Sequence, residues 1–301
     1  MRPAVAWLLK AAVTGALLAW LFSNAEIRRG LGVLTQAEPG WLVLGGMAAG
    51  LAQVFSAWRW QVCLRTAGVM LPALTVLRIT LAGTAAGFLS VGVLGTDVVR
   101  AALAVRRCPQ QRAPLVASIG MDHACGFPVL VVVGLAVLTM AGGKVTTGQG
   151  VWIGAGLGLV IFLIVGLVLR RWWPDLHRRL RDSLRQARTW RGIAGAVVLS
   201  VPAVLCHYGV FYGTARALGV VVPPAEFFGA TAVADTVAAL PVSLAGLGVR
   251  EKAFETILGH WHGVPAAQAV ALSLAGLGLI LLWGLAGAVC WLAEPVRKRT
   301  P

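Results

Sequence analysis

Charged residues are scarce in this sequence. They make up 12% of the 301 residues, about half of the ~25% that is usual for a soluble domain. Acidic residues are the scarcest, with 11 Asp and Glu against 26 Lys and Arg, whereas hydrophobic residues reach 58% and the mean hydropathy is +0.81. This balance excludes a water-soluble fold and predicts a single membrane domain over residues 1–301. Because the basic residues lie between long apolar runs, the net charge of +15 favours an anionic membrane surface, and not nucleic acid, as the partner.

Motifs for metal binding and catalysis are also lacking. The five cysteines are odd in number, scattered and never arranged as CxxC, which argues against both a disulfide framework and a zinc site. We interpret them as small apolar packing residues. The histidines of the outer loop His260-Trp261-His262 are too few for a metal site, and an interfacial Trp cluster explains this stretch better. Neither a Ser-His-Asp order nor paired catalytic carboxylates stand out, so we expect no enzyme activity, no cofactor and no metal.

Six apolar windows are long enough to cross a bilayer, which takes about 20 residues. They are residues 5–23, 41–57, 113–141, 151–169, 192–215 and 268–292. The first window could pass for a signal peptide, but because further spans follow we interpret it as an uncleaved first span. The arginine-rich connections are residues 59–65, 100–112 and 170–191, with a basic tail at 297–299. The positive-inside rule then predicts that both termini are cytoplasmic.

Two further apolar stretches, residues 71–96 and 221–258, each begin and end on one side of the membrane by the same charge rule. Gly and Pro interrupt both, which predicts re-entrant hairpins whose irregular backbone is covered by protein or water. Residues 89–95 align with residues 240–246 at an offset of 151, almost half the chain. The predicted fold is an all-α integral membrane protein, a polytopic helical bundle of six full spans plus two re-entrant hairpins in an inverted repeat. The pseudo-repeats are about residues 1–145 and 146–301.

Ionisable groups gather where each hairpin ends, although such a group at bilayer depth costs ~2.5–3.5 kcal/mol. The first hairpin leads into Asp97 and Arg100, and the second into Arg250 and Glu251. In both, glycine allows a sharp turn and a helix then begins, so that free N–H groups and the two arginines can hold a phosphate. Asp97 and Glu251 are expected to hold the guanidinium groups in place. Alternatively, the arginines only anchor helix ends at the interface by snorkelling.

Three further ionisable residues are candidates for proton coupling or for lining a polar cavity. Asp122 and His123 lie within the third crossing, where an acid beside a titratable ring could relay protons. A local Asp–His pair lining a polar seam is an equal alternative. Asp235 lies in the incoming arm of the second hairpin, whereas His207, beside Tyr208, is interpreted as a helix-packing group.

The most basic connection is the segment Arg170–Arg191. It holds eight arginines against Asp175 and Asp182, with three tryptophans interleaved. This composition is typical of an amphipathic segment that lies in the membrane interface. We therefore expect the segment to bind an anionic membrane surface.

The hairpin ends and the third crossing resemble the lysylphosphatidylglycerol synthase transmembrane family, also called the flippase-like domain. The matching pieces are residues 87–101, Asp122-His123 and, most specifically, residues 240–251. The resemblance runs from about Trp7 to Leu292. The sequence departs from the family pattern at Ser90, Thr96 and His123, where the family often has Pro, Gly and Arg.

The resemblance implies translocation of, or a supporting role for, phospholipids, polyprenyl-linked glycolipids or hopanoid-type lipids in the bacterial cytoplasmic (inner) membrane. It implies a stand-alone member without the aminoacyl-transferase domain of the fused synthases, so lipid lysylation is not carried over. We expect a lipid translocator that binds the headgroup phosphate between the two hairpins. The alternatives are a membrane transferase that uses the same acids as bases, and an accessory protein that recruits a lipid-synthesis enzyme. The lipid, the direction, the energy source and the oligomeric state are left open.

Overall fold

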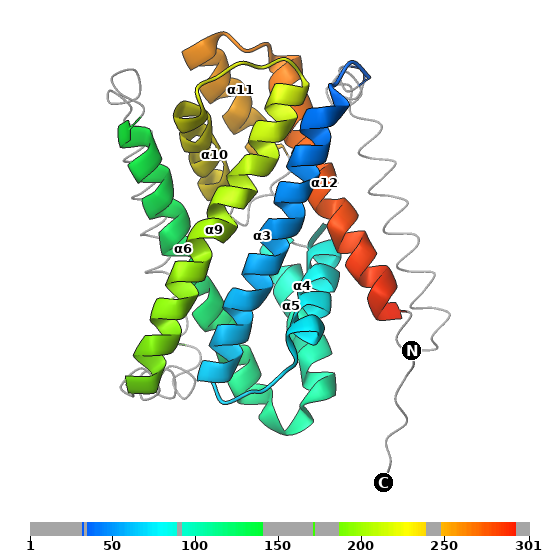
Figure 1. The fold of residues 1–301 in the computed structure, drawn as a ribbon, viewed down its shortest axis with the longest axis vertical. Coiled ribbons are helices and arrows are strands. Elements are labelled where there is room, and N and C mark those ends of the chain that lie inside the picture. The colour runs from blue at the N-terminus through cyan, green and yellow to red at the C-terminus, as the bar shows by residue number, and fades with distance from the viewer. Residues whose placement is uncertain are drawn as a thin grey trace.

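All regular structure in the described part of the chain is helical (Figure 1). The computed structural model describes residues 35–88, 92–140, 187–238 and 248–292, together with positions 32 and 171. These ranges contain eight α-helices and one short 3-10 helix. They are α3 (Pro39–Thr66), α4 (Ala73–Phe88), α5 (Gly92–Arg107), η1 (Pro109–Gln111), α6 (Arg112–Met140), α9 (Ala187–Ala217), α10 (Pro224–Ala238), α11 (Val249–His262) and α12 (Ala266–Leu292). The predicted all-α class is therefore confirmed for this part of the chain.

Four of the described helices are long and apolar enough to cross a membrane. The spanning segments are Pro39–Thr66, Pro109–Gly134, Trp190–Ala217 and Ala266–Cys290. Each has between 25 and 28 residues, more than the ~20 that a crossing needs, and each contains or overlaps one of the predicted windows. The other two windows, residues 5–23 and 151–169, lie outside the described residues, as do residues 172–186 of the basic segment. The chain is a multi-pass membrane protein.

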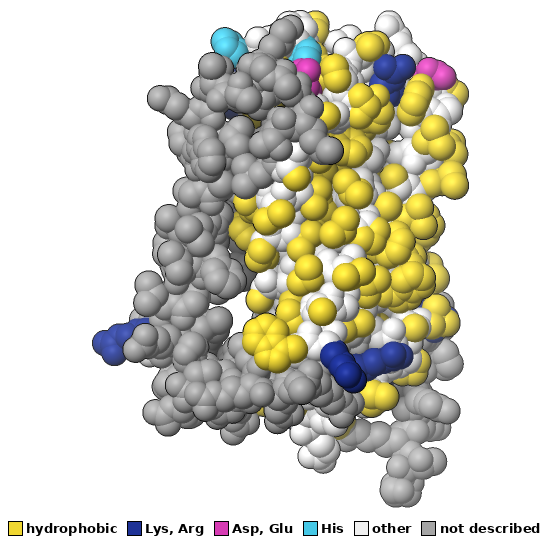
Figure 2. Space-filling model, turned by 60° about the vertical axis from the view of Figure 1, so that its left-hand side comes forward, with side chains coloured by type: hydrophobic (Ala, Val, Ile, Leu, Met, Phe, Trp, Pro, Cys, Tyr) yellow, Lys and Arg dark blue, Asp and Glu magenta, His cyan; other side chains and the backbone are white. Residues whose placement is uncertain are grey.

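The outer surface of these helices is apolar. Large side chains such as Val43, Leu282 and Val289 are exposed. Figure 2 shows apolar side chains over most of the height of one face, with basic side chains near its upper and lower ends. Because soluble monomers rarely expose so continuous an apolar surface, this band is the face that contacts lipid.

Helix α3 is longer than the predicted second span. It begins at Pro39, whose fixed φ suits the first turn, and ends at Thr66, two residues before Gly68 with its φ of 83°. The interpretation of residues 59–65 as a connection is therefore wrong, because they form the last two turns of α3. Arg59 consequently lies within the helix bundle.

The helices form two sets of four with matching order. At an offset of 151 residues, helices α9, α10, α11 and α12 overlap α3, α4, α5 and α6. Helices α3 and α9, which correspond to each other, pack together at the centre. The packing of α4 on α12 corresponds to that of α10 on α6, and the packing of α3 on α12 corresponds to that of α9 on α6. Figure 1 shows α4 and α5 in the lower half of the molecule and α10 and α11 in the upper half. Every packing of the first set thus has a counterpart in the second.

Glycine allows the two central helices to approach closely. A Cβ atom at Gly213 of α9 would lie 2.9 Å from the Cα atom of Gly45 of α3. Small residues at such crossings are the usual way for membrane helices to gain van der Waals contact, since lipid supplies no hydrophobic driving force between them. This crossing sets the distance between the two sets of helices.

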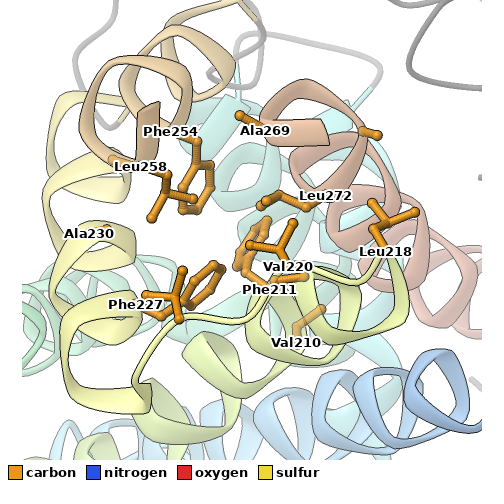
Figure 3. Packing of buried hydrophobic residues seen from close by; sticks show 14 of the residues in the cluster. Val210, Phe211, Leu218, Val220, Phe227, Ala230, Phe254, Leu258, Ala269 and Leu272 are labelled. Atoms are coloured by element: carbon orange, nitrogen blue, oxygen red, sulfur yellow. The ribbon is translucent and has the colours of Figure 1, made fainter. Parts of the chain in front are cut away.

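Each set of four helices also has its own apolar core. In the second set, the Phe254 ring of α11 lies 5.7 Å from the Phe211 ring and 5.9 Å from the Phe227 ring, measured between centroids. Figure 3 shows these rings with Leu272 of α12. In the first set, the core contains the fully buried Trp60 of α3. These cores hold the short helices against the long ones and so position the polar side chains of α5 and α11.

Candidate functional site

A buried carboxylate joins three helices of the first set. Asp122 of α6 has a side chain that is only 1% exposed. Its Oδ1 accepts a hydrogen bond from Nε of Arg59 on α3 at 2.7 Å, and its Oδ2 accepts one from Nη2 of Arg100 on α5 at 3.1 Å. Bonds between ionised partners are roughly twice as strong as neutral ones. Asp122 therefore fixes α5 against both α3 and α6.

Glycine and tryptophan make room for these two arginines. A Cβ atom at Gly126, one turn after the carboxylate, would lie 2.5 Å from Nη1 of Arg59. A Cβ atom at Gly83 of α4 would lie 2.8 Å from Cγ of Arg100. The guanidinium of Arg100 lies over the Trp60 ring, 4.1 Å from its centroid, in a cation–π contact. The small residues and the ring thus determine where the two guanidinium groups lie.

Asp97 and His123 extend the same network outward. Oδ2 of Asp97 lies 2.6 Å from Nε2 of His123, and Oδ1 accepts a hydrogen bond from Nη1 of Arg100 at 3.4 Å. The exposed fraction of the side chain falls from 44% at His123 to 18% at Asp97 and 1% at Asp122. The expected contact between Asp97 and Arg100 is present, but it is the longest in the network.

A second buried carboxylate joins three helices of the second set. Oδ1 of Asp235 on α10 accepts a hydrogen bond from Nε of Arg250 on α11 at 3.0 Å, and Oδ2 lies 2.9 Å from Nε2 of His207 on α9. The Arg250 guanidinium lies 5.5 Å from the centroid of the Phe211 ring. The centroid of the His207 ring lies 5.3 Å from the same Phe211 centroid. Asp235 thus fixes the start of α11 against α9.

Glu251 closes the first turn of α11. Its Oε2 accepts a hydrogen bond from the N–H of Gly248 at 2.6 Å, and its Oε1 accepts one from Oγ of Ser273 on α12 at 2.7 Å. Gly248 has a φ of 83°, which an L-residue rarely adopts. The expectation that Glu251 holds Arg250 is wrong, because Arg250 pairs with Asp235 instead. Consecutive helix residues point about 100° apart, so the two side chains meet different neighbouring helices.

One contact recurs at matched positions of the two sets. Arg100 of α5 binds Asp122 of α6, and the residues 151 positions later, Glu251 of α11 and Ser273 of α12, also bind each other. The backbone relation between the sets is therefore kept, whereas the charge of the paired groups is not. This agrees with the only approximate symmetry of charge in the aligned sequences.

Each set also contains an arginine, a carboxylate and a histidine linked in that order. The first triad is Arg100–Asp97–His123, and the second triad is Arg250–Asp235–His207. In both, the carboxylate bridges the guanidinium and Nε2 of the imidazole. The arginine of each triad lies over an aromatic ring, and these rings, Trp60 and Phe211, are 151 residues apart. The carboxylates and histidines, by contrast, come from positions that do not match.

Both triad arginines retain an N–H donor for which no described residue supplies an acceptor. Nε of Arg100 and Nη1 of Arg250 are these atoms, and both are buried. A buried donor without a partner costs about 1–3 kcal/mol. Each triad can therefore take an additional acceptor oxygen. Within the described ranges, no three His, Cys, Asp or Glu side chains come together as a metal site would require.

Sequence reasoning placed Asp97, Arg100, Asp122, His123 and Asp235 in a polar region, and the structure brings them into the two networks above. Asp122 and His123 bind different partners, the carboxylate of Asp122 binding Arg59 and Arg100 and the ring of His123 binding Asp97, while a role of this region in proton transfer stays a prediction.

Two network residues, Arg59 and His207, are missing from the sequence-based candidates. The interpretation of His207 as a packing group is incomplete, because its ring binds Asp235. Both residues lie within apolar helices long enough to cross a membrane, where an ionisable group is costly, and this signal could have identified them. The pairing itself has no signal in the sequence, since Arg59 and Asp122 are 63 residues apart.

At the other end of the second set, His260-Trp261-His262 forms the last turn of α11, so its interpretation as an outer loop is wrong. Nε2 of His262 lies 2.7 Å from Oε2 of Glu226 at the start of α10. This contact joins the start of α10 to the end of α11.

Comparison with known proteins assigns the chain to a family. The family model described as the lysylphosphatidylglycerol synthase TM region matches residues 7–290. No curated protein matches the chain significantly. The matched range spans nearly all of the described helices, including the residues of both triads. The chain therefore belongs to the lysylphosphatidylglycerol synthase transmembrane-region family.

Proposed function

We propose that this protein translocates lipids across the bacterial cytoplasmic membrane and binds the headgroup phosphate at Arg100 and Arg250. The observation that carries the proposal is one largely buried arginine in each matched set of helices, each with a buried N–H donor left over. Guanidinium groups bind phosphate through two parallel hydrogen bonds. Membership in a family named for the membrane region of a lipid synthase supports a lipid as the cargo.

The lengths of the short helices support two re-entrant hairpins. Helices α4 and α5 have 16 residues each, and α10 and α11 have 15 and 14. At 1.5 Å per residue they are about 21 to 24 Å long, whereas the hydrocarbon core is about 30 Å thick. Figure 1 shows the two pairs in opposite halves of the molecule, as hairpins from opposite leaflets require. With the windows at residues 5–23 and 151–169, the chain then has six full spans and an inverted repeat.

In this proposal the phosphate reaches Arg100 by replacing Asp97. The contact between these two residues is the longest in its network at 3.4 Å, and Asp97 is more exposed than Asp122. Asp122 keeps its hydrogen bond and holds the guanidinium in place. In the second set, Arg250 binds phosphate through Nη1 while Asp235 keeps Nε. The acyl chains stay in lipid beside the helices.

The distribution of basic residues along the sequence determines the proposed orientation of the chain in the membrane. Both termini and the opening of the first hairpin lie on the cytoplasmic side, and residues 170–191 lie on the anionic cytoplasmic surface. The cargo is a phospholipid or a polyprenyl- or hopanoid-type lipid. It leaves the protein chemically unchanged, so the protein acts as a translocator and not as an enzyme.

Translocation is tested with the purified full chain in liposomes that contain headgroup-labelled phosphatidylglycerol. We expect exchange between leaflets that is faster than in protein-free vesicles. Arg100→Gln and Arg250→Gln each lower the rate about tenfold or more, because a hydrogen bond to a charged group contributes ~1.5–3 kcal/mol. The matched control, Arg65→Gln, removes the same charge from the exposed end of α3 and keeps the rate.

Three outcomes contradict the proposal. Exchange no faster than in protein-free vesicles, with both anionic and polyprenyl lipids, rules out translocation by the chain alone. A chemically altered lipid, detected by mass spectrometry of the same vesicles, indicates a transferase. Loss of function after neutralising residues 170–191, with the two arginine variants fully active, indicates an accessory protein that recruits a partner.

A further inference from the structure

Before a headgroup binds, the formal charges within each triad sum to zero. In each, the guanidinium contributes +1 and the carboxylate −1, so that a neutral imidazole leaves the triad at zero. Arg59 and Asp122, which adjoin the first triad, also sum to zero. A phosphodiester headgroup with one negative charge leaves an occupied triad at −1. An unbalanced charge away from water is costly, so headgroup binding needs a compensating positive charge.

The histidine of each triad lies where it can supply that charge. Nε2 of His123 is 2.6 Å from Asp97, and Nε2 of His207 is 2.9 Å from Asp235. Histidine is the side chain whose charge ordinarily changes near neutral pH. When phosphate takes Arg100 away from Asp97, an imidazolium at His123 becomes the partner of that carboxylate.

We propose that each triad takes up one proton on its histidine when it binds one phosphate headgroup, so that a proton and a lipid move together. This inference rests on the proposed function. The proton comes from water and adds to the imidazole, and no other covalent bond changes. In the occupied triad, the positive charges of the guanidinium and the imidazolium then balance the negative charges of the phosphate and the carboxylate.

The neighbouring charged groups support the histidines as the proton acceptors. Among the described residues, His123 binds Asp97, which is linked through Arg100 to Asp122 and Arg59. His207 binds Asp235, which also binds Arg250, and the Tyr208 ring lies beside the His207 ring. Asp122 is already shared by two guanidinium groups. Proton coupling therefore belongs to the triads, and Asp122 has a positioning role.

The energy source follows from the charge of the moving pair. A proton and a headgroup of charge −1 sum to zero, so the membrane potential does no work on their transfer. A pH difference does drive it, because one pH unit is a tenfold ratio of proton activity. The lipid should therefore accumulate in the more alkaline leaflet, regardless of the potential.

Phosphatidylglycerol present as a trace lipid in phosphatidylcholine vesicles is a suitable probe. External periodate cleaves the diol of its headgroup only in the outer leaflet, which measures its distribution. With the full chain reconstituted, the potential held at zero and the lumen one pH unit more alkaline, we expect about tenfold enrichment in the inner leaflet. With a potential of about 100 mV and no pH difference we expect none, whereas an anion moving alone would redistribute about 50-fold.

Two variants and two controls complete the test. The double variant His123→Gln with His207→Gln lowers the enrichment from about tenfold to about onefold. His260→Gln, which removes an exposed histidine at the end of α11, keeps it. Protein-free vesicles under the same gradients give the background.

The outcomes separate the two proposals. Exchange that follows the potential and ignores the pH difference overturns proton coupling and leaves translocation intact. Full enrichment in the double histidine variant overturns the assignment to the triads. Absence of exchange under every condition overturns the proposed function together with this inference.

Discussion

Replacing Asp122 with asparagine is the sharpest test of the first network. The change keeps the shape of the side chain but removes the one negative charge shared by Arg59 and Arg100. The 3.4 Å contact with Asp97 becomes the only carboxylate contact of Arg100 among the described residues, and Arg59 loses its carboxylate partner. Removing one partner of a buried ion pair costs about 3–5 kcal/mol, because the remaining charge stays buried. We expect the free energy of unfolding to fall by this amount.

The measurement is equilibrium unfolding of the purified protein in detergent micelles. The control is Glu255→Gln, which breaks the pair between Lys252 and Glu255, whose side chains are 69% and 31% exposed. Exposed pairs contribute about 0–1 kcal/mol, so this variant should unfold almost as the wild type does.

A double variant separates charge from packing. Asp122→Asn combined with Arg59→Gln returns the formal charge of the network to zero. It should therefore be more stable than the sum of the two single changes by about 0.5–3 kcal/mol. A loss for Asp122→Asn no larger than for Glu255→Gln, or strict additivity in the double variant, would refute the reasoning.

Two further predictions concern packing and orientation. Gly213→Ala should destabilise the protein by about 1–3 kcal/mol, because the added Cβ atom would meet the backbone of Gly45. The control Gly278→Ala should not destabilise it, because a Cβ atom there meets nothing within 4 Å. Thermal unfolding in detergent measures both variants, and equal effects would contradict the close crossing of α3 and α9. An impermeant maleimide should label Cys108 only after cells are permeabilised, and should leave the fully buried Cys63 unlabelled until the protein unfolds. Labelling of Cys108 in intact cells would reverse the proposed orientation.

Much of the architecture was predictable because membrane insertion is a local property. Apolar windows and arginine-rich ends depend on composition over about 20 residues, and four of the six windows coincide with long apolar helices. The offset of 151 residues, taken from one short alignment, also relates the eight described helices. The ends of the helices were not predictable in this way. Arg59 follows an apolar run, and a charged residue after such a run does not by itself show whether the helix ends there or continues, as α3 does to Thr66.

The polar networks were predictable only in part. Asp97, Arg100, Asp122 and Asp235 are conspicuous because an ionisable group in an apolar segment is costly. The partner of each was not predictable from spacing, as Glu251 shows by binding Gly248 and Ser273 instead of the adjacent arginine.

The sequence by itself determined that this is a multi-pass membrane protein with two related halves and with charge retained where each of the two interrupted apolar stretches ends. Only the tertiary structure decided which charges meet, because Asp122 binds residues 22 and 63 positions away on two other helices. It also decided that both halves contain an Arg–Asp–His triad, although the acids and histidines occupy unmatched positions. The physical reason is that a buried charge needs a partner close in space, whichever helix supplies it.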